Sequence, residues 1–238
     1  MAYYKDPKFI AFLDILGFKD IVSNNKHEML ERKLRDFSAI IENLNGIFTS
    51  IGDEIPLPQK IEVLTVSDSI IIWTDDDSQE SFALITIAVS EILRHSFYNG
   101  TPLRGALTRG SLSVIQKKHQ TNIFGIGLIN AYLLESTLNM SGCAIENDTF
   151  RYNVVSQKLI KDKYIVKYDT SFKPVKNNLS KNEYVINWVN ESVVQSDISK
   201  YFTAHNKKID NESVYTKILN TANYIEFIKK NNLLLDDE

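Results

Sequence analysis

The sequence predicts an α/β sandwich in which a largely antiparallel sheet is flanked by helices. Strand-type and helix-type stretches follow in the order strand, helix, hairpin, helix, two strands, helix and short strand. This order differs from the regular alternation that builds a doubly wound parallel sheet. With 238 residues, 43% of them hydrophobic, the chain can form one sizeable core, or a catalytic domain with a C-terminal extension.

The first strand is expected at residues 9–13, an apolar run typical of a strand covered on both faces. Asp14 follows directly, and a carboxylate in this setting is costly unless it is paired, hydrogen-bonded or bound to a metal. Gly17 permits a tight turn into a helix whose free N–H groups point back toward Asp14. Asp14 is therefore either the N-cap of that helix or part of a site for Mg²⁺ and phosphates.

The middle of the chain alternates helices with β-rich runs. Apolar residues at three- and four-residue steps predict a long helix at 26–48, followed by a loop at 51–59. The runs 61–65 and 69–74 read as a hairpin with Asp68 at or near its tip. The further expected elements are a polar capping loop at 75–78, a helix at 82–97, strands at 103–108 and 111–115, a loop at 116–122, a helix opened by 123–127 and ending near 136, and a short strand at 142–145.

From about residue 147 the composition shifts toward Asn, Lys, Ser and Tyr. Strands are expected at 163–168 and 183–189 with a polar loop at 173–181 between them, and helices near 193–205 and 213–231. We therefore expect a catalytic core at 1–146. Residues 147–238 are expected to form a C-terminal extension that completes the sheet and adds helices.

Composition narrows the classes of function. A formal net charge of −3 does not indicate a basic face for nucleic acid, although a few local cations suffice for a triphosphate. The single cysteine, Cys143, excludes an intramolecular disulfide and a multi-cysteine zinc site, which suits a reducing cytoplasm. No apolar segment approaches the length of a membrane span. A cytoplasmic protein with neither nucleic acid nor direct membrane contact is expected.

Asp14 and Asp68 are the best candidates for chemistry, because each is an isolated acid beside a strand of Ile, Leu, Val and Phe. If the two strands are neighbours, both carboxylates reach one edge of the sheet. They then repel each other, and a pair of divalent cations is the usual remedy. Such a pair can activate a hydroxyl on one side and a leaving phosphate on the other. The alternative is that Asp68 is an ordinary β-turn residue.

Four motifs resemble the class III nucleotide cyclases. FLDILGF resembles their FxDIxGF opening, VSDSIII their hairpin with the second metal-binding Asp, LRGALTRG their R-x-G-I-x-x-G strand, and IFGIGLINAYLLE the opening of their G-x-x-V-N-x-A helix. The resemblance covers roughly residues 9–146. Within the family, the D-I-L-G-F turn, the S-D-S-I hairpin, the R-G strand and A-Y-x-L-E are most similar to the pyrimidine cyclases of bacterial Pycsar anti-phage systems.

This resemblance implies cyclisation of UTP or CTP to a 3′,5′-cyclic nucleotide and pyrophosphate, and a product that activates a separate effector protein. It implies two Mg²⁺ or Mn²⁺ ions held by Asp14, Asp68 and the Ile15 carbonyl. The N–H groups of three residues would hold the β- and γ-phosphates: Leu16, Gly17 and Phe18. It further implies a triphosphate contact by Arg104 and a homodimer whose sites lie between the subunits.

Several positions depart from the purine cyclases. Leu64 stands where they place an adenine-reading Lys, and Asn122 where they place its partnering Asp, which favours another base. Ile129 and Leu133 stand where they carry a transition-state Asn and Arg. Asn130 and Tyr132 are shifted by one residue, and Tyr132 is either a core or a base-stacking residue. Arg109 is a candidate cation for the transition state.

Two alternatives stay open beside the pyrimidine cyclase. One is a purine cyclase with an unorthodox pocket. The other is a catalytically inactive cyclase-like module that senses nucleotides or dimerises. The missing Asn and Arg favour it, and the retained Asp14, Asp68, Gly17 turn and Arg104 oppose it. A palm-type polymerase or cyclic-dinucleotide synthase is disfavoured, because the hairpin lacks a doubled acid.

Overall fold

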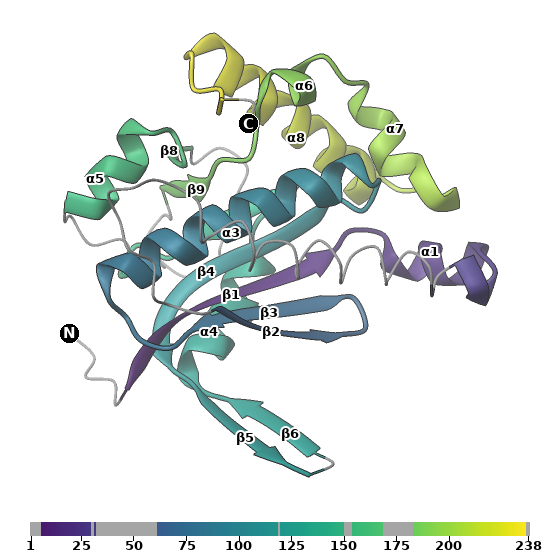
Figure 1. The fold of residues 1–238 in the computed structure, drawn as a ribbon. Helices are drawn as coiled ribbons and strands as arrows, with labels where there is room; N and C mark the ends of the chain where they lie inside the picture. Colours follow the sequence, from purple (N-terminus) through teal and green to yellow (C-terminus); the bar gives the residue numbers. More distant parts are fainter. Residues whose placement is uncertain are drawn as a thin grey trace.

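A twisted mixed sheet forms the centre of the molecule (Figure 1). The computed structural model describes residues 6–29, 31, 61–118, 120–149, 154–168 and 183–236. Within these residues, seven strands pair in the order β2-β3-β1-β4-β7-β9-β8. The strands are β1 (Pro7–Ile15), β2 (Ile61–Val66), β3 (Ser69–Thr74), β4 (Leu103–Ser111), β7 (Gly142–Ile145), β8 (Ile165–Lys167) and β9 (Tyr184–Ile186). Only β4 and β7 pair in parallel, so the predicted α/β sandwich with a largely antiparallel sheet is confirmed.

Helices cover both faces of this sheet. α3 (Gln79–Tyr98) packs on one face with the main core, which contains Phe9, Ala11 and Leu13 of β1. α4 (Ile126–Glu135) packs against β1 and β4 on the other face, where Ile10 belongs to a smaller apolar cluster. The alternation of β1 residues between the two clusters follows from the two-residue period of a strand. β1 is therefore apolar on both faces because each face packs against one of these two layers.

α3 has its cap in the predicted loop at 75–78 but begins at Gln79, before the predicted start at residue 82. The Ser78 hydroxyl accepts a hydrogen bond from the Ser81 N–H at 3.2 Å, which satisfies one of the free donors of the first turn. The helix ends at Tyr98 with Asn99 as its C-cap, and Gly100 follows with φ of 72°. A short helix, α1 (Phe18–Asn24), follows β1, and its N-cap is Gly17, which provides no side-chain cap.

The C-terminal part of the chain belongs to the same core. It contains α5 (Val154–Lys161), α6 (Glu191–Val194), α7 (Ile198–Thr203), the 3₁₀ helix η1 (Ala204–Asn206) and α8 (Glu212–Lys230). β9 and β8 extend the sheet beyond β7, and the buried Trp188 ring lies 4.7 Å from that of Phe97 in α3. Among the helices that the structure describes, none has both the length and the apolar character that a membrane crossing requires.

One expected loop is instead a hairpin. Residues 116–122 were expected to be irregular, whereas β5 (Ser113–Lys117) and β6 (Gln120–Phe124) form a separate two-stranded sheet that projects from the rest (Figure 1). Most of its side chains are exposed on both faces, so the hydrophobic alternation that marks a half-buried strand is missing. α5 was also missed. Most of the expected helix at 26–48, and the expected loops at 51–59 and 173–181, lie outside the described residues.

Candidate active site

Asp14 lies next to the end of β1, in the middle of the sheet. Its neighbours in register are Ser69 on β3 and Arg104 on β4. Burial, and then the charges of Asp68 and Glu135, raise the pKa of Asp14 to about 6, while Arg104 opposes this shift. The N-cap of α1 is Gly17. Asp14 is therefore a crowded strand carboxylate and does not cap the helix.

Asp68 occupies the tight turn between β2 and β3. Ser67, before it, has a left-handed φ of 58°. The Asp68 carbonyl accepts a hydrogen bond from the Ile15 N–H at 3.0 Å, which fastens the turn to the end of β1. The structure thus brings Asp14 and Asp68 to one edge of the sheet, near enough for their charges to interact.

The turn after β1 depends on Gly17. Its φ of 79° and ψ of 20° lie in the left-handed region, which glycine adopts without steric cost. The Leu16 N–H donates to the Pro102 carbonyl at 2.9 Å. That bond occupies the Leu16 amide and corrects the expectation that it holds a phosphate. The N–H groups of Gly17 and Phe18 donate to no acceptor among the described residues.

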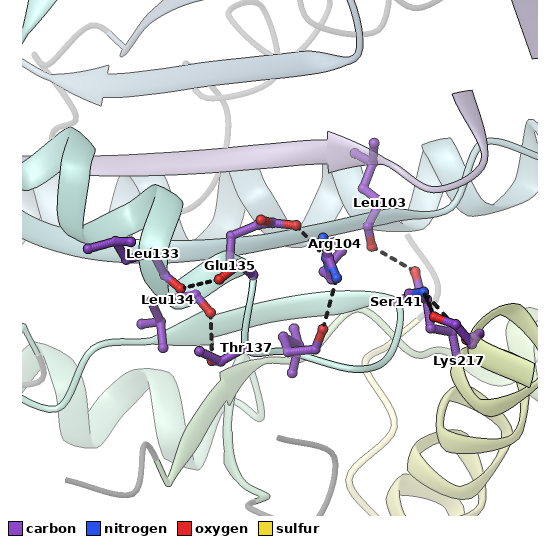
Figure 2. A network of polar contacts seen from close by, with 11 residues as sticks. Leu103, Arg104, Leu133, Leu134, Glu135, Thr137, Ser141 and Lys217 are labelled. Atoms are coloured by element: carbon purple, nitrogen blue, oxygen red, sulfur yellow. Dashed lines mark hydrogen bonds and ion pairs between the residues drawn. The ribbon is translucent and has the colours of Figure 1, made fainter. Parts of the chain in front are cut away.

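Arg104 is engaged by a buried carboxylate from α4 (Figure 2). Its Nε donates to Glu135 Oε1, and its Nη1 donates to the Leu138 carbonyl at 3.4 Å. The two side chains of the ion pair are only 14% and 4% exposed. The sequence pattern indicated Arg104 but not Glu135, whose only signal was its place in the AYLLE stretch. The predicted contact between Arg104 and a triphosphate stays a prediction, and it competes with this ion pair.

Arg109 lies five residues further along β4, opposite Phe9 of β1. Its Nε donates to Asp77 Oδ2 at 2.7 Å, and its Nη2 bonds the same oxygen. Nearby, Asn130 Nδ2 donates to Glu146 Oε1 at 3.3 Å, and burial raises the pKa of Glu146. Within one chain, Arg109 and Asn130 therefore belong to a polar cluster at the other end of β4 from Asp14.

The three residues expected to meet the base are dispersed over one chain. Leu64 on β2 packs against the smaller apolar cluster. Asn122 lies on the projecting hairpin, where its Oδ1 accepts from Gln120 Nε2 at 3.1 Å. Tyr132 on α4 is 57% exposed, with its ring edge-on to Phe12 at 5.6 Å. Its exposure excludes the alternative that Tyr132 is a core residue within one chain.

The aspartate pair fits a divalent cation. Among the described residues no cluster of three or more His, Cys, Asp or Glu could hold a metal alone. Asp14 and Asp68, however, concentrate negative charge at the sheet edge, and the Asp14 carboxyl accepts no hydrogen bond from a described residue. Mg²⁺ typically takes one or two protein carboxylates and completes its shell with phosphate oxygens and water. The residues present match that pattern.

Exposed apolar residues run from the end of β6 along α4. They are between 40% and 57% exposed and are Phe124, Ile126, Ile129, Tyr132 and Leu133. Exposed apolar groups this close together are typical of an interaction surface.

Comparisons with solved structures show the fold. The chain is similar to the guanylyl cyclase domain of the RhoGC fusion protein from the aquatic fungus Blastocladiella emersonii, which is described as a non-canonical dimer. That match has a TM-score of 0.50 and 16% identity, and it covers 78% of this chain and 98% of that one. A bacterial light-regulated adenylyl cyclase matches with a TM-score of 0.49 and 11% identity, over 84% and 97% of the two chains. Adenylate cyclases from Trypanosoma brucei in their monomeric state give a TM-score of 0.48 and 13% identity, over 79% and 96%.

The chain therefore has the fold of a class III nucleotide cyclase domain, and the solved structures that it resembles are adenylyl and guanylyl cyclases. No protein-family model matches the sequence. No curated protein sequence matches it either.

Proposed function

We propose that this protein is a nucleotide cyclase that converts UTP or CTP to the 3′,5′-cyclic monophosphate and pyrophosphate. One observation carries the proposal: Asp14 and Asp68, far apart in sequence, meet at one sheet edge beside the Gly17 turn. Burial and then the charges of Asp68 and Glu135 raise the pKa of Asp14, and a divalent cation bound by the two aspartates would offset their repulsion.

The residues at this edge would bind the metal ions and the phosphates. Asp14, Asp68 and the Ile15 carbonyl would hold two Mg²⁺ or Mn²⁺ ions, which supply Lewis-acid activation of the 3′-hydroxyl and charge neutralisation at the phosphates. The N–H groups of Gly17 and Phe18 would bind the β- and γ-phosphates. In the reaction, the 3′-oxygen bonds to the α-phosphorus as the bond to the pyrophosphate oxygen breaks, and the hydroxyl proton is released to the medium.

The base-reading side chains argue for a pyrimidine. Leu64 and Asn122 would replace the charged Lys and Asp that read adenine in purine cyclases, so a purine loses its charge-assisted hydrogen bonds. Tyr132 presents an exposed ring, and we propose that it stacks on the base. Arg109 and Asn130 of the second subunit of a dimer would contact the phosphates.

A homodimer would complete the site. One chain places Asp14 and Asn122 on different parts of the fold, the sheet edge and the projecting hairpin. The exposed apolar residues beside that hairpin, including Ile129 and Leu133, provide a surface that a second copy would cover. The cyclic product would then act in the cytoplasm as a second messenger of bacterial anti-phage defence, through a separate effector protein.

The direct test incubates the purified dimer with each of the four NTPs and Mn²⁺ and separates the products by chromatography. We expect pyrophosphate and a cyclic pyrimidine nucleotide, from UTP or CTP. A cyclic purine product would assign the chain to the purine alternative. Inertness toward all four, at a concentration where the dimer is verified, would overturn the cyclase proposal.

An inactive nucleotide-binding module is the second candidate. Ile129 and Leu133 support it, because they are apolar and exposed where purine cyclases carry their transition-state Asn and Arg. Under this alternative, calorimetry detects binding of a nucleoside triphosphate with Mn²⁺, while no pyrophosphate is released.

A further inference from the structure

A segment from the C-terminal part of the chain is fastened to α1. We call this segment, residues 204–208, the strap; it begins with η1. Two side-chain amides of α1 and its C-cap donate to strap carbonyls: Asn24 Nδ2 to Asn206 at 2.8 Å and Asn25 Nδ2 to His205 at 2.7 Å. The Lys208 N–H donates to Asp20 Oδ2 at 3.1 Å. The helix that follows the Gly17 turn is thus held by residues some 180 positions away in sequence.

Within the strap, Lys207 is buried against the Gly17 turn. The residue is only 7% exposed. A Cβ added at Gly17 would lie 2.8 Å from Lys207 Cδ, so the lysine stem packs directly on the turn. Position 17 therefore requires glycine both for its left-handed φ and for the space that Lys207 fills.

The Lys207 ammonium is buried without a carboxylate partner. Its Nζ donates to the Gly100 carbonyl at 2.6 Å and to the Tyr201 carbonyl at 3.1 Å. No carboxylate in the described part of the chain lies within 4.0 Å of it. Burial lowers the pKa of Lys207 to about 7, and the charge of Asp20 opposes this shift. A buried cation that lacks a full counter-charge is costly, which calls for a reason in function.

A small cavity of about 60 Å³ adjoins this lysine and the turn. Its lining includes Leu16 and Gly17 of the turn, the carboxylate residue Asp20, and the lysines Lys207, Lys208 and Lys217. Three lysines and one aspartate therefore surround the cavity next to the turn. The guanidinium groups of Arg104 and Arg109, by contrast, are already bound to Glu135 and Asp77.

We propose that Lys207 is a positioning residue for the triphosphate: its stem sets the Gly17 turn, and its buried ammonium places positive charge behind the amides that meet the phosphates. This inference rests on the proposed function and assigns a task to the C-terminal part of the chain. The charge acts through a poorly solvated interior, where an electrostatic attraction is stronger than in water. The strap orders α1 so that this charge and the amides keep one arrangement.

The experiment measures ligand binding by calorimetry in the presence of Mn²⁺, with inorganic tripolyphosphate and UMP as the two probes. Lys207→Met keeps the stem and removes the charge, and Lys207→Gln keeps donors for the two carbonyls. Both variants are expected to bind tripolyphosphate at least about tenfold more weakly than the unmodified protein. UMP, which lacks the β- and γ-phosphates, is expected to bind within about twofold of the unmodified protein. Lys200→Met is the matched control, because its side chain on α7 is 80% exposed.

The outcomes separate this inference from the proposed function. Tripolyphosphate affinity that is unchanged in both Lys207 variants overturns the inference even where UTP or CTP is cyclised. Equal weakening of UMP and tripolyphosphate, with a lowered melting temperature, also overturns it and leaves Lys207 a purely structural residue. Failure of the unmodified protein to bind tripolyphosphate overturns it as well. Selective loss of tripolyphosphate binding supports it, whether or not any NTP is turned over.

Discussion

The two ends of β4 each carry an arginine paired with a carboxylate, yet they differ in whether the further carboxylate nearby is hydrogen-bonded by the protein. At the Arg109 end, Glu146 accepts hydrogen bonds from Asn130 and Thr149, both at 3.3 Å. At the Arg104 end, Asp14 faces two further carboxylates and accepts no hydrogen bond from a described residue. Carboxylates are crowded at both ends, since burial and then the charge of Asp148 raise the pKa of Glu146 as well. The carboxylate at the Arg109 end has hydrogen-bond donors from the protein, whereas Asp14 has none among the described residues. That unmet hydrogen-bonding capacity, rather than the presence of an ion pair, distinguishes a candidate cation site.

The largest effect is expected for Asp68→Asn. Loss of a carboxylate that holds the cations should lower the rate of pyrophosphate release by about 10³-fold or more, since metal activation contributes several kcal/mol. Circular dichroism should show an intact fold, because the Asp68 backbone bond to Ile15 is retained. Asp75→Asn, on an exposed loop, is the matched control. A collapsed fold would instead make Asp68 a structural turn residue.

Glu135→Gln should lower the free energy of unfolding by about 2 to 3 kcal/mol, because it removes the buried carboxylate that is ion-paired with the Arg104 guanidinium. Urea denaturation followed by tryptophan fluorescence measures this change. A double replacement, Arg104→Met with Glu135→Leu, should recover part of the loss, since no unpaired charge then stays buried. A loss no larger than that of Asp77→Asn would contradict the distinction drawn between the two ends.

Asp14→Asn should stabilise the metal-free protein, in a pH-dependent way. The folded chain keeps the Asp14 proton up to a pKa of about 6, against 3.8 for an ordinary aspartate. Folding therefore takes up a proton between these values, so stability falls as the pH rises from about 4 to about 6 and then levels off. The variant lacks this pH-dependent fall in stability. Its free energy of unfolding should equal that of the unmodified protein near pH 4 and exceed it by about 1 to 2 kcal/mol above pH 6, a difference reduced by the partial exposure of Asp14. Denaturation curves across this range test the sign, and a destabilised variant above pH 6 would refute it.

The smallest effect is expected at the other end of β4. Asp77→Asn should cost about 1 kcal/mol or less, because the Asp77 side chain is 31% exposed against 4% for Glu135, so water weakens this ion pair from the aspartate side. The same urea experiment measures it, and adding 0.5 M salt should shrink the difference further. A cost above that of Glu135→Gln would show that exposure of the carboxylate does not set the cost of losing these ion pairs.

Much of the fold could be predicted because its signals are local. The apolar run before Asp14, the polar turn between β2 and β3 and the Ser78 cap each depend on residues within one element. The β5–β6 hairpin could not be predicted, because it pairs only with itself and buries few side chains. Of the two carboxylates that act on Asp14, only Asp68 could be predicted, because it interrupts an apolar strand setting. Glu135 could not, because nothing in the sequence distinguishes it from other helical residues.

The sequence by itself determined where strands and turns form and which two aspartates are candidates for metal binding. It could do so because side-chain periodicity and backbone preferences act over a few residues. Only the tertiary structure decided which charges meet. Arg104 selects Glu135 from 31 residues away, and Gly17 packs on Lys207 from the C-terminal part of the chain. The physical reason is that electrostatic pairing and close packing depend on distance in space, and chain folding sets that distance independently of position in sequence.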